Sequence, residues 1–113
     1  MLLGKSAGVL VILKGIFENK LKPKACIFLG IPIFWARANN FFIDEYLKNF
    51  QTPALFIQQS EDPAIPANNL QELLLGLEVK NYKFITIPGS DHSYDDFSLV
   101  SYHIFQFLES SAN

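Results

Sequence analysis

The sequence predicts an α/β domain in which a parallel sheet of about four strands is flanked by helices. Short, continuous apolar runs alternate along the chain with longer segments of helical periodicity, and Gly and Pro separate the two kinds. Such alternation is typical of β-α-β units, whose right-handed crossovers bring the carboxyl end of every strand to one edge of the sheet. The 113 residues are 50% hydrophobic and 18% charged, which favours a single globular domain over residues 1–113.

The first half of the chain is predicted to contribute two strands and one long helix. Residues 1–3 form the end of a buried strand, and residues 6–19 form a helix that is apolar on nearly every side and therefore suited to an interior. Residues 25–29 form a second strand, an unbroken apolar run ended by glycine and proline. Residues 31–51 mix aromatic with polar side chains, show no strand periodicity and allow a short helix.

The third predicted strand and its helix follow Pro53. Residues 54–57 are a short apolar run, and a polar turn comes after them. A stripe with the spacing i, i+3, i+4, i+7 then marks a helix: Leu70, Leu73, Leu74 and Leu77. Asn69 and Glu72 resemble a capping box at the start of this helix.

The last strand and helix occupy the end of the chain. Residues 82–87 form a fourth strand, and the turn after it contains proline and glycine. A final helix begins at Asp95 or Asp96 and ends near Leu108. The residues expected on its buried face are Phe97, Val100, Ile104 and Leu108.

Charge and cysteine content bear on the class of function. Nine basic and eleven acidic residues give a net charge of −2 without a basic cluster, so no nucleic-acid partner is expected. The single cysteine, Cys26, lies in an apolar run and fits a reduced, buried position in a cytoplasmic protein better than a metal ligand or a nucleophile. No apolar stretch reaches the ~18 residues of a membrane helix, so no membrane partner is expected.

A secretory signal peptide is the alternative interpretation of the first residues. Residues 1–13 are largely apolar and contain one lysine. Lys14, Glu18 and Lys20 follow without a small-x-small cleavage site. We therefore favour the strand and helix described above.

Residues 4–8 read GKSAG, a G-x-S-x-G pentapeptide between the first predicted strand and the first predicted helix. A serine in this pattern projects from a tight strand-to-helix turn, and the flanking glycines allow close approach of the backbone. The start of the helix places N–H groups where they can stabilise a developing oxyanion. Because the pentapeptide alone is common, two interpretations remain open: Ser6 is a nucleophile, or Ser6 caps the helix.

Three polar turns follow predicted strands and should meet at the carboxyl edge of the sheet. Ser6 follows the first strand, Asp62 the third and His92 the fourth. A serine hydroxyl becomes nucleophilic when an adjacent histidine takes its proton, and a carboxylate can orient that histidine. Asp62 precedes Pro63 and is also a common kind of turn residue. Three other residues are weaker candidates because they fit a turn, a helix start or a solvated position: Asp91, Asp95 and His103.

The order Ser, Asp, His along the chain is that of the α/β-hydrolase superfamily, and two local sequences resemble its motifs. Residues 59–66, QSEDPAIP, resemble the G-x-x-D-x-x-V-P turn of the family, with Gln59 in place of the glycine and Ile65 in place of the valine. Residues 87–94, IPGSDHSY, resemble the histidine turn of dienelactone-hydrolase-like members. The chain is therefore similar to this family in three motifs that occur in the right order.

The resemblance implies a Ser-Asp-His triad. Ser6 would be the nucleophile, His92 the general base and Asp62 the residue that orients the imidazole. The backbone amide of Ala7 would be one donor of the oxyanion hole. The substrate would be a small acyl compound, and no metal or organic cofactor is implied.

The resemblance covers nearly the whole chain but corresponds to the carboxyl-terminal half of the family fold. Residues 1–113 are thus expected to form a partial α/β-hydrolase domain, without the first four strands and the loop that carries the second oxyanion donor. The strand at residues 1–3 would be an open edge, suited to self-association or to a partner that supplies the missing half. Trp35, with Phe41 and Phe42, is expected to line an acyl or aromatic pocket or to pack over the sheet edge.

Two functions from different classes are therefore expected. The first is a serine hydrolase for an ester, a thioester or a small amide, with weak turnover because half of the oxyanion hole lies outside this chain. The second is a non-catalytic remnant that acts as an interaction or structural module through its open edge.

Overall fold

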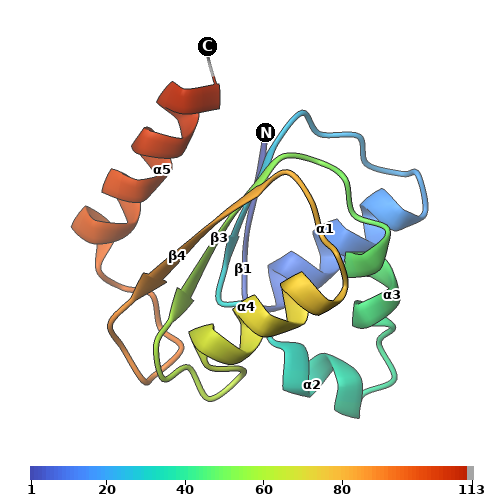
Figure 1. The fold of residues 1–113 in the computed structure, drawn as a ribbon, viewed down its shortest axis with the longest axis horizontal. Coiled ribbons are helices and arrows are strands. Elements are labelled where there is room, and N and C mark those ends of the chain that lie inside the picture. The colour runs from blue at the N-terminus through green and yellow to red at the C-terminus, as the bar shows by residue number, and fades with distance from the viewer. Residues whose placement is uncertain (112–113) are drawn as a thin grey trace.

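Four parallel strands form a single sheet in a computed structural model that describes residues 1–111 (Figure 1). The spatial order of the strands equals their order in the chain: β1 (Leu2–Lys5), β2 (Cys26–Leu29), β3 (Ala54–Gln59) and β4 (Tyr82–Ile87). The register aligns Gly4 with Phe28 and Phe28 with Phe56. The predicted α/β class with a parallel sheet of four strands is confirmed.

Helices cover both faces of this sheet. They are α1 (Ala7–Phe17), α2 (Ile33–Ala38), α3 (Ile43–Lys48), α4 (Ala67–Gly76) and α5 (Phe97–Ser111). The helices that connect strands lie together on one face, as right-handed crossovers require, and α5 packs alone on the other (Figure 1). The short helices α2 and α3 occupy the segment at residues 31–51, where the sequence allowed a short helix.

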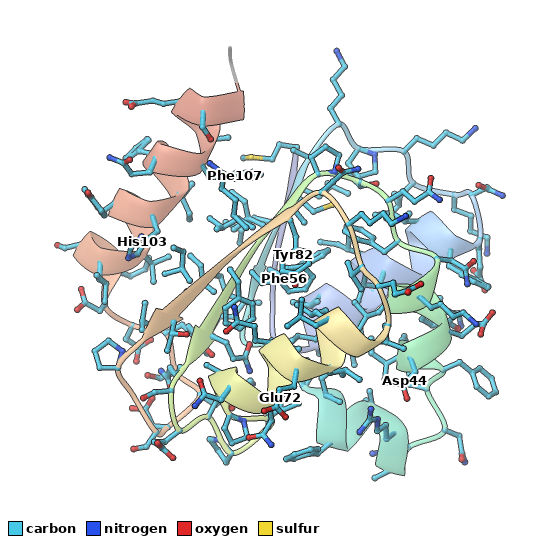
Figure 2. The ribbon with its side chains drawn as sticks, viewed as in Figure 1. Asp44, Phe56, Glu72, Tyr82, His103 and Phe107 are labelled. Atoms are coloured by element: carbon cyan, nitrogen blue, oxygen red, sulfur yellow. The ribbon has the colours of Figure 1, made fainter. Side chains whose placement is uncertain are left out.

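Aromatic packing fills the larger of the two cores. Phe28 and Phe56 are each 1% exposed, and their rings meet edge-on at 5.3 Å between centroids. Phe56 also meets Tyr82 at 5.7 Å, and Figure 2 shows these two side chains near the centre of the molecule. Because β2 and β3 are buried along their whole lengths, β2 and the first four residues of β3 read as continuous apolar runs in the sequence.

The start of α4 differs from the prediction. The helix begins at Ala67, directly after Pro66, and no side chain caps it. Asn69 consequently lies within the first turn, and the predicted capping box of Asn69 and Glu72 is wrong. Pro66 is extended directly before the helix, so this proline marks the start of α4 without a side-chain cap.

Two apolar patterns are also corrected by burial. Phe97, the first residue of α5, is 80% exposed, so it does not belong to the buried face predicted for this helix. Phe107, which was not predicted on that face, is buried instead. Helix α1 is not enclosed on all sides, because Val11 is 67% exposed while Val9 and Leu13 are buried. Cys26 is fully buried, as predicted.

Strand β1 is an edge of the sheet, as expected for the first strand of this chain. The amide of Leu2 donates to the carbonyl of Ala25, directly before β2, and the amide of Ser6 donates to the carbonyl of Leu29 at the end of β2. Since successive residues of a strand point their amides to alternate sides, the backbone groups of Leu3 and Lys5 face the open edge. Leu3 is 50% exposed. The turn that carries Ser6 therefore lies at the margin of the sheet.

Candidate active site

Ser6 occupies a strained turn between β1 and α1. Its backbone has φ 52° and ψ −120°, a conformation that residues with a side chain rarely adopt. A Cβ at Gly4 would lie 2.9 Å from the amide nitrogen of Val9, so glycine at this position allows the helix to approach the strand. Gly8 has no such constraint, because a Cβ there would meet nothing within 4 Å. Only the first glycine of the pentapeptide is therefore required by close packing.

The side chain of Ser6 does not cap α1. Its Oγ lies 2.8 Å from Nε2 of His92, which is 86 positions further along the chain. The interpretation of Ser6 as a helix cap is therefore wrong. The hydroxyl is directed at an imidazole instead.

His92 lies between Ser6 and Asp62. Its Nδ1 is 2.8 Å from Oδ2 and 3.0 Å from Oδ1 of Asp62. Because a carboxylate can only accept, Nδ1 carries the proton, and Nε2 is left free to accept the hydroxyl proton of Ser6. The imidazole is 24% exposed, whereas the carboxylate is fully buried. The three predicted residues thus form one continuous hydrogen-bonded chain.

Asp62 receives two further hydrogen bonds that fix its orientation. The hydroxyl of Tyr94 donates to Oδ2 at 2.7 Å, and the amide of Ala64 donates to Oδ1 at 2.8 Å. Burial, together with the bond to Asp62, raises the pKa of the Tyr94 phenol well above its ordinary value. Tyr94 therefore remains a protonated donor over the whole physiological range of pH.

Gln59, at the end of β3, holds the loop that carries the imidazole. Its side-chain oxygen accepts from the amides of Asp91 and His92, at 3.1 Å and 2.9 Å. Its backbone amide donates to the Tyr94 hydroxyl at 2.7 Å. His92 and Tyr94 both have positive φ, of 63° and 57°, and these hydrogen bonds keep the loop in that conformation.

The weaker candidates have roles outside the triad, although the Asp91 carboxylate accepts from the side-chain amide of Gln59 at 3.1 Å. Asp91 accepts from the amide and hydroxyl of Ser93, and the hydrogen bond from the Ser93 amide lowers the pKa of its carboxyl. The backbone carbonyl of Asp95 accepts from Phe97 at the start of α5. His103 is a half-buried side chain beside Tyr102 on α5 (Figure 2). The turn and helix-start contacts expected for the two aspartates are present.

Three residues at the site were not singled out from the sequence: Gln59 as a loop anchor, Tyr94 and Gly30. Gly30 has φ 64°, and a Cβ there would lie 2.5 Å from the Tyr94 ring and 3.1 Å from the His92 ring. Its position directly after a predicted buried strand is the sequence signal that could have identified Gly30. Tyr94 gave a weaker signal, since aromatic residues near a sheet edge more often serve packing.

A pocket of about 330 Å³ opens beside the Ser6 hydroxyl. Its walls are Ser6, Ala7, Pro32, Trp35, Ala64 and His92. Trp35 therefore lies where the sequence analysis expected it. Phe41 and Phe42 do not: they line a separate hollow beside α3, and Phe41 packs edge-on against Tyr46. Of the two alternatives expected for these aromatic residues, the pocket beside Ser6 is wrong for Phe41 and Phe42, and packing describes Phe41.

A larger hollow of about 490 Å³ lies where the chain enters β3 and β4. Lys48, Glu78 and Lys80 are among its lining residues, and none of the lining residues is a serine, cysteine or histidine. Despite its size, this hollow lacks the chemistry found at the carboxyl edge. Ala7, in contrast, is the first residue of α1, so its amide has no acceptor in a preceding helical turn and is available beside Ser6.

No protein-family model, curated protein or solved structure matches this chain. Among residues 1–111, no helix is long and apolar enough to cross a membrane. The same residues contain no cluster of three or more His, Cys, Asp or Glu side chains suited to a metal ion.

Proposed function

We propose that this protein is a serine hydrolase of the α/β-hydrolase type that acts on an ester, a thioester or a small amide. The observation that supports the proposal is the unbroken hydrogen-bonded chain from Ser6 through His92 to Asp62. Ser6 Oγ lies 2.8 Å from Nε2 of His92, and Nδ1 of His92 lies 2.8 Å from Oδ2 of Asp62. The three groups come from turns after β1, β3 and β4. The resemblance of residues 59–66 and 87–94 to α/β-hydrolase motifs supports the same assignment.

In the proposed reaction, Ser6 Oγ attacks the carbonyl carbon of the substrate while its proton passes to Nε2 of His92. Asp62 stabilises the resulting imidazolium through Nδ1–H. The carbonyl oxygen becomes an oxyanion, to which the amide of Ala7 donates at the N-terminus of α1. The imidazolium then gives its proton to the leaving alcohol, thiol or amine, and an acyl group remains on Ser6.

Water completes the proposed cycle. His92 takes a proton from the water molecule as it attacks the acyl carbon, and it returns that proton to Ser6 Oγ when the ester bond breaks. The products are a carboxylic acid and the free enzyme. The steps require neither a metal nor an organic cofactor.

We expect slow turnover by this chain. An oxyanion hole normally combines at least two donors, and losing one lowers turnover by about 10²–10³. Ala7 is the donor we assign in this chain, and the open edge at β1 leaves one side of Ser6 without a neighbouring strand. The expected rate is therefore low but dependent on Ser6.

We also propose a small acyl compound as the substrate and the cytoplasm as the location. The single cysteine, Cys26, is fully buried as a free thiol, which suits a reducing compartment. The proposed partners include neither nucleic acid nor a membrane. The open edge of β1 is available to a second copy or to a segment that would extend the sheet.

That edge also supports a second candidate function. No strand within the described part of the chain pairs with the backbone groups of Leu3 and Lys5, and the Leu3 side chain is half exposed. A non-catalytic module that associates through β1 would retain the triad without using it. The fold is the same in both cases, so activity must distinguish them.

Hydrolysis of p-nitrophenyl acetate tests the proposal. We expect weak turnover that disappears in Ser6→Gly, a substitution compatible with φ 52° at this position, and in His92→Gln. His103→Gln, which changes the other histidine, is the matched control and should retain the wild-type rate. Equal hydrolysis by wild type and Ser6→Gly would favour the non-catalytic module.

A further inference from the structure

The pocket beside Ser6 is apolar on the walls that face the hydroxyl. Four of its lining residues are apolar: Ala7, Pro32, Trp35 and Ala64. Trp35 is 56% exposed, so much of its indole surface is free to contact a ligand. Of the six lining residues, only Ser6 and His92 carry polar side chains with a role in the proposed reaction.

Hydrogen bonds between the loops make this pocket a fixed shape. The buried side chain of Gln58 accepts from the amide of Ile31 at 3.1 Å and donates to the carbonyl of Ile65 at 3.0 Å. The amide of Phe34 donates to the carbonyl of Ala64 at 3.1 Å. The wall that carries Trp35 is thereby tied to the wall that carries Ala64, so little ordering is needed when a ligand enters.

Among residues 1–111, no lysine, arginine, aspartate or glutamate lines the pocket. Arg37, two positions after Trp35, is paired with Asp44 at 3.0 Å on the outside of α2 and lines a different hollow. A ligand carboxylate that entered the pocket would lose hydration without gaining a cationic partner. An apolar group that entered the pocket would remove apolar surface from water, and this burial favours binding.

We infer that the pocket selects a small, uncharged, apolar acyl group, with an aromatic ring as the preferred filling against Trp35. The volume lies at the lower end of the range for small-molecule sites, about 300–1,000 Å³, which suits a small acyl group. Indole and aryl rings gain attraction from offset or edge-on stacking in addition to buried area. This inference rests on the proposed hydrolase function and specifies its substrate class.

The fluorescence of Trp35 provides a binding test that needs no turnover, because it is the only tryptophan in the chain. The probes are N-methyl-p-toluamide and N-methylterephthalamate. They differ only at the para position, where the first carries a methyl group and the second a carboxylate. We expect a saturable change in Trp35 emission with the neutral amide. The anionic amide should bind roughly tenfold more weakly or worse, the size expected for desolvating an unpaired polar group.

Charge placed on the pocket wall should reverse this preference. In Ala64→Arg, the guanidinium can pair with the terephthalamate carboxylate, so the affinity ratio should move by about tenfold or more towards the anionic amide. Asn68→Arg is the matched control, because residue 68 is exposed and does not line the pocket. The control should keep the wild-type ratio.

Two results would overturn the inference: no saturable binding of either amide, or equal or tighter binding of the anionic amide by the wild type. The same titration with Ser6→Gly separates this inference from the proposed function. If both proteins bind the neutral amide selectively but the wild type hydrolyses p-nitrophenyl acetate no faster than Ser6→Gly, the hydrolase is refuted and the neutral pocket is retained. Ser6-dependent hydrolysis without selectivity would retain the hydrolase and refute the pocket assignment.

Discussion

Tyr94 donates its hydroxyl proton to Oδ2 of Asp62 across 2.7 Å, and the same oxygen lies 2.8 Å from Nδ1 of His92. The tyrosine is 5% exposed and also accepts the amide of Gln59. Its hydroxyl therefore connects the end of β3 with the buried carboxylate. This contact restricts rotation of Asp62, which in turn holds the imidazole towards Ser6.

Tyr94→Phe should lower both stability and reactivity. The substitution removes a hydrogen bond to a buried carboxylate and leaves the Gln59 amide without its acceptor, so we expect a loss of about 1.5–3 kcal/mol in the free energy of unfolding. Urea denaturation measures this loss. Tyr102→Phe makes the same chemical change on an exposed residue of α5 and should be nearly neutral. Equal stability of the two variants would contradict the role assigned to Tyr94.

Gln59→Ala should loosen the loop that carries His92. Two amides lose their acceptor, and the loop no longer has these bonds to hold its positive φ values. We expect kcat for p-nitrophenyl acetate to fall by about tenfold with little change in KM, since the substrate pocket does not include Gln59. Gln51→Ala, at an exposed position, is the control. A rise in KM at unchanged kcat would argue against a positioning role.

The buried strands were predictable because parallel strands covered on both faces must be apolar throughout. The end of β3 was not. The predicted strand ends at residue 57 and Gln59 is predicted to begin a polar turn, yet β3 continues through Gln58 and Gln59, which are 1% and 4% exposed. Their amide side chains satisfy backbone groups of neighbouring loops. Such polar burial depends on distant partners and leaves no periodic signal.

The candidate active site could likewise be predicted from the sequence only in part. Ser6, Asp62 and His92 could be selected from the sequence, because each follows a predicted strand and parallel topology brings strand ends together. Their mutual distances could not be derived, since they depend on Gly30, Gln59 and the backbone conformation of residues 92–94. Trp35 was placed correctly at the pocket. Phe41 and Phe42 directly precede α3 and line a different hollow, which the sequence did not indicate.

Cys26 should resist thiol reagents in the folded protein. Burial raises the pKa of its thiol from 9.0 to about 11, so the unreactive protonated form dominates at pH 8. We expect negligible reaction with Ellman's reagent at that pH until guanidinium chloride unfolds the chain. Rapid reaction of the folded protein would show that the strand is more accessible than its burial indicates.

The same shift predicts a loss of stability in alkali. The unfolded chain releases the thiol proton near pH 9 and the folded chain only near pH 11, so the unfolded state binds fewer protons in between. The contribution of Cys26 to the free energy of unfolding is complete below pH 9 and falls as the pH rises through this window. Urea midpoints of wild type and Cys26→Ala between pH 8 and 11 should therefore converge.

Reaction with a fluorophosphonate tests the central claim most directly, because it reports whether Ser6 is an activated nucleophile. Phosphorus is attacked by Ser6 Oγ, fluoride leaves, and intact-mass and peptide mapping locate the adduct. We predict one adduct, formed slowly and only on Ser6, that is absent in Ser6→Gly, is strongly retarded in His92→Gln and forms at the wild-type rate in His103→Gln. No adduct on Ser6, or one that forms equally fast without His92, would contradict the claim.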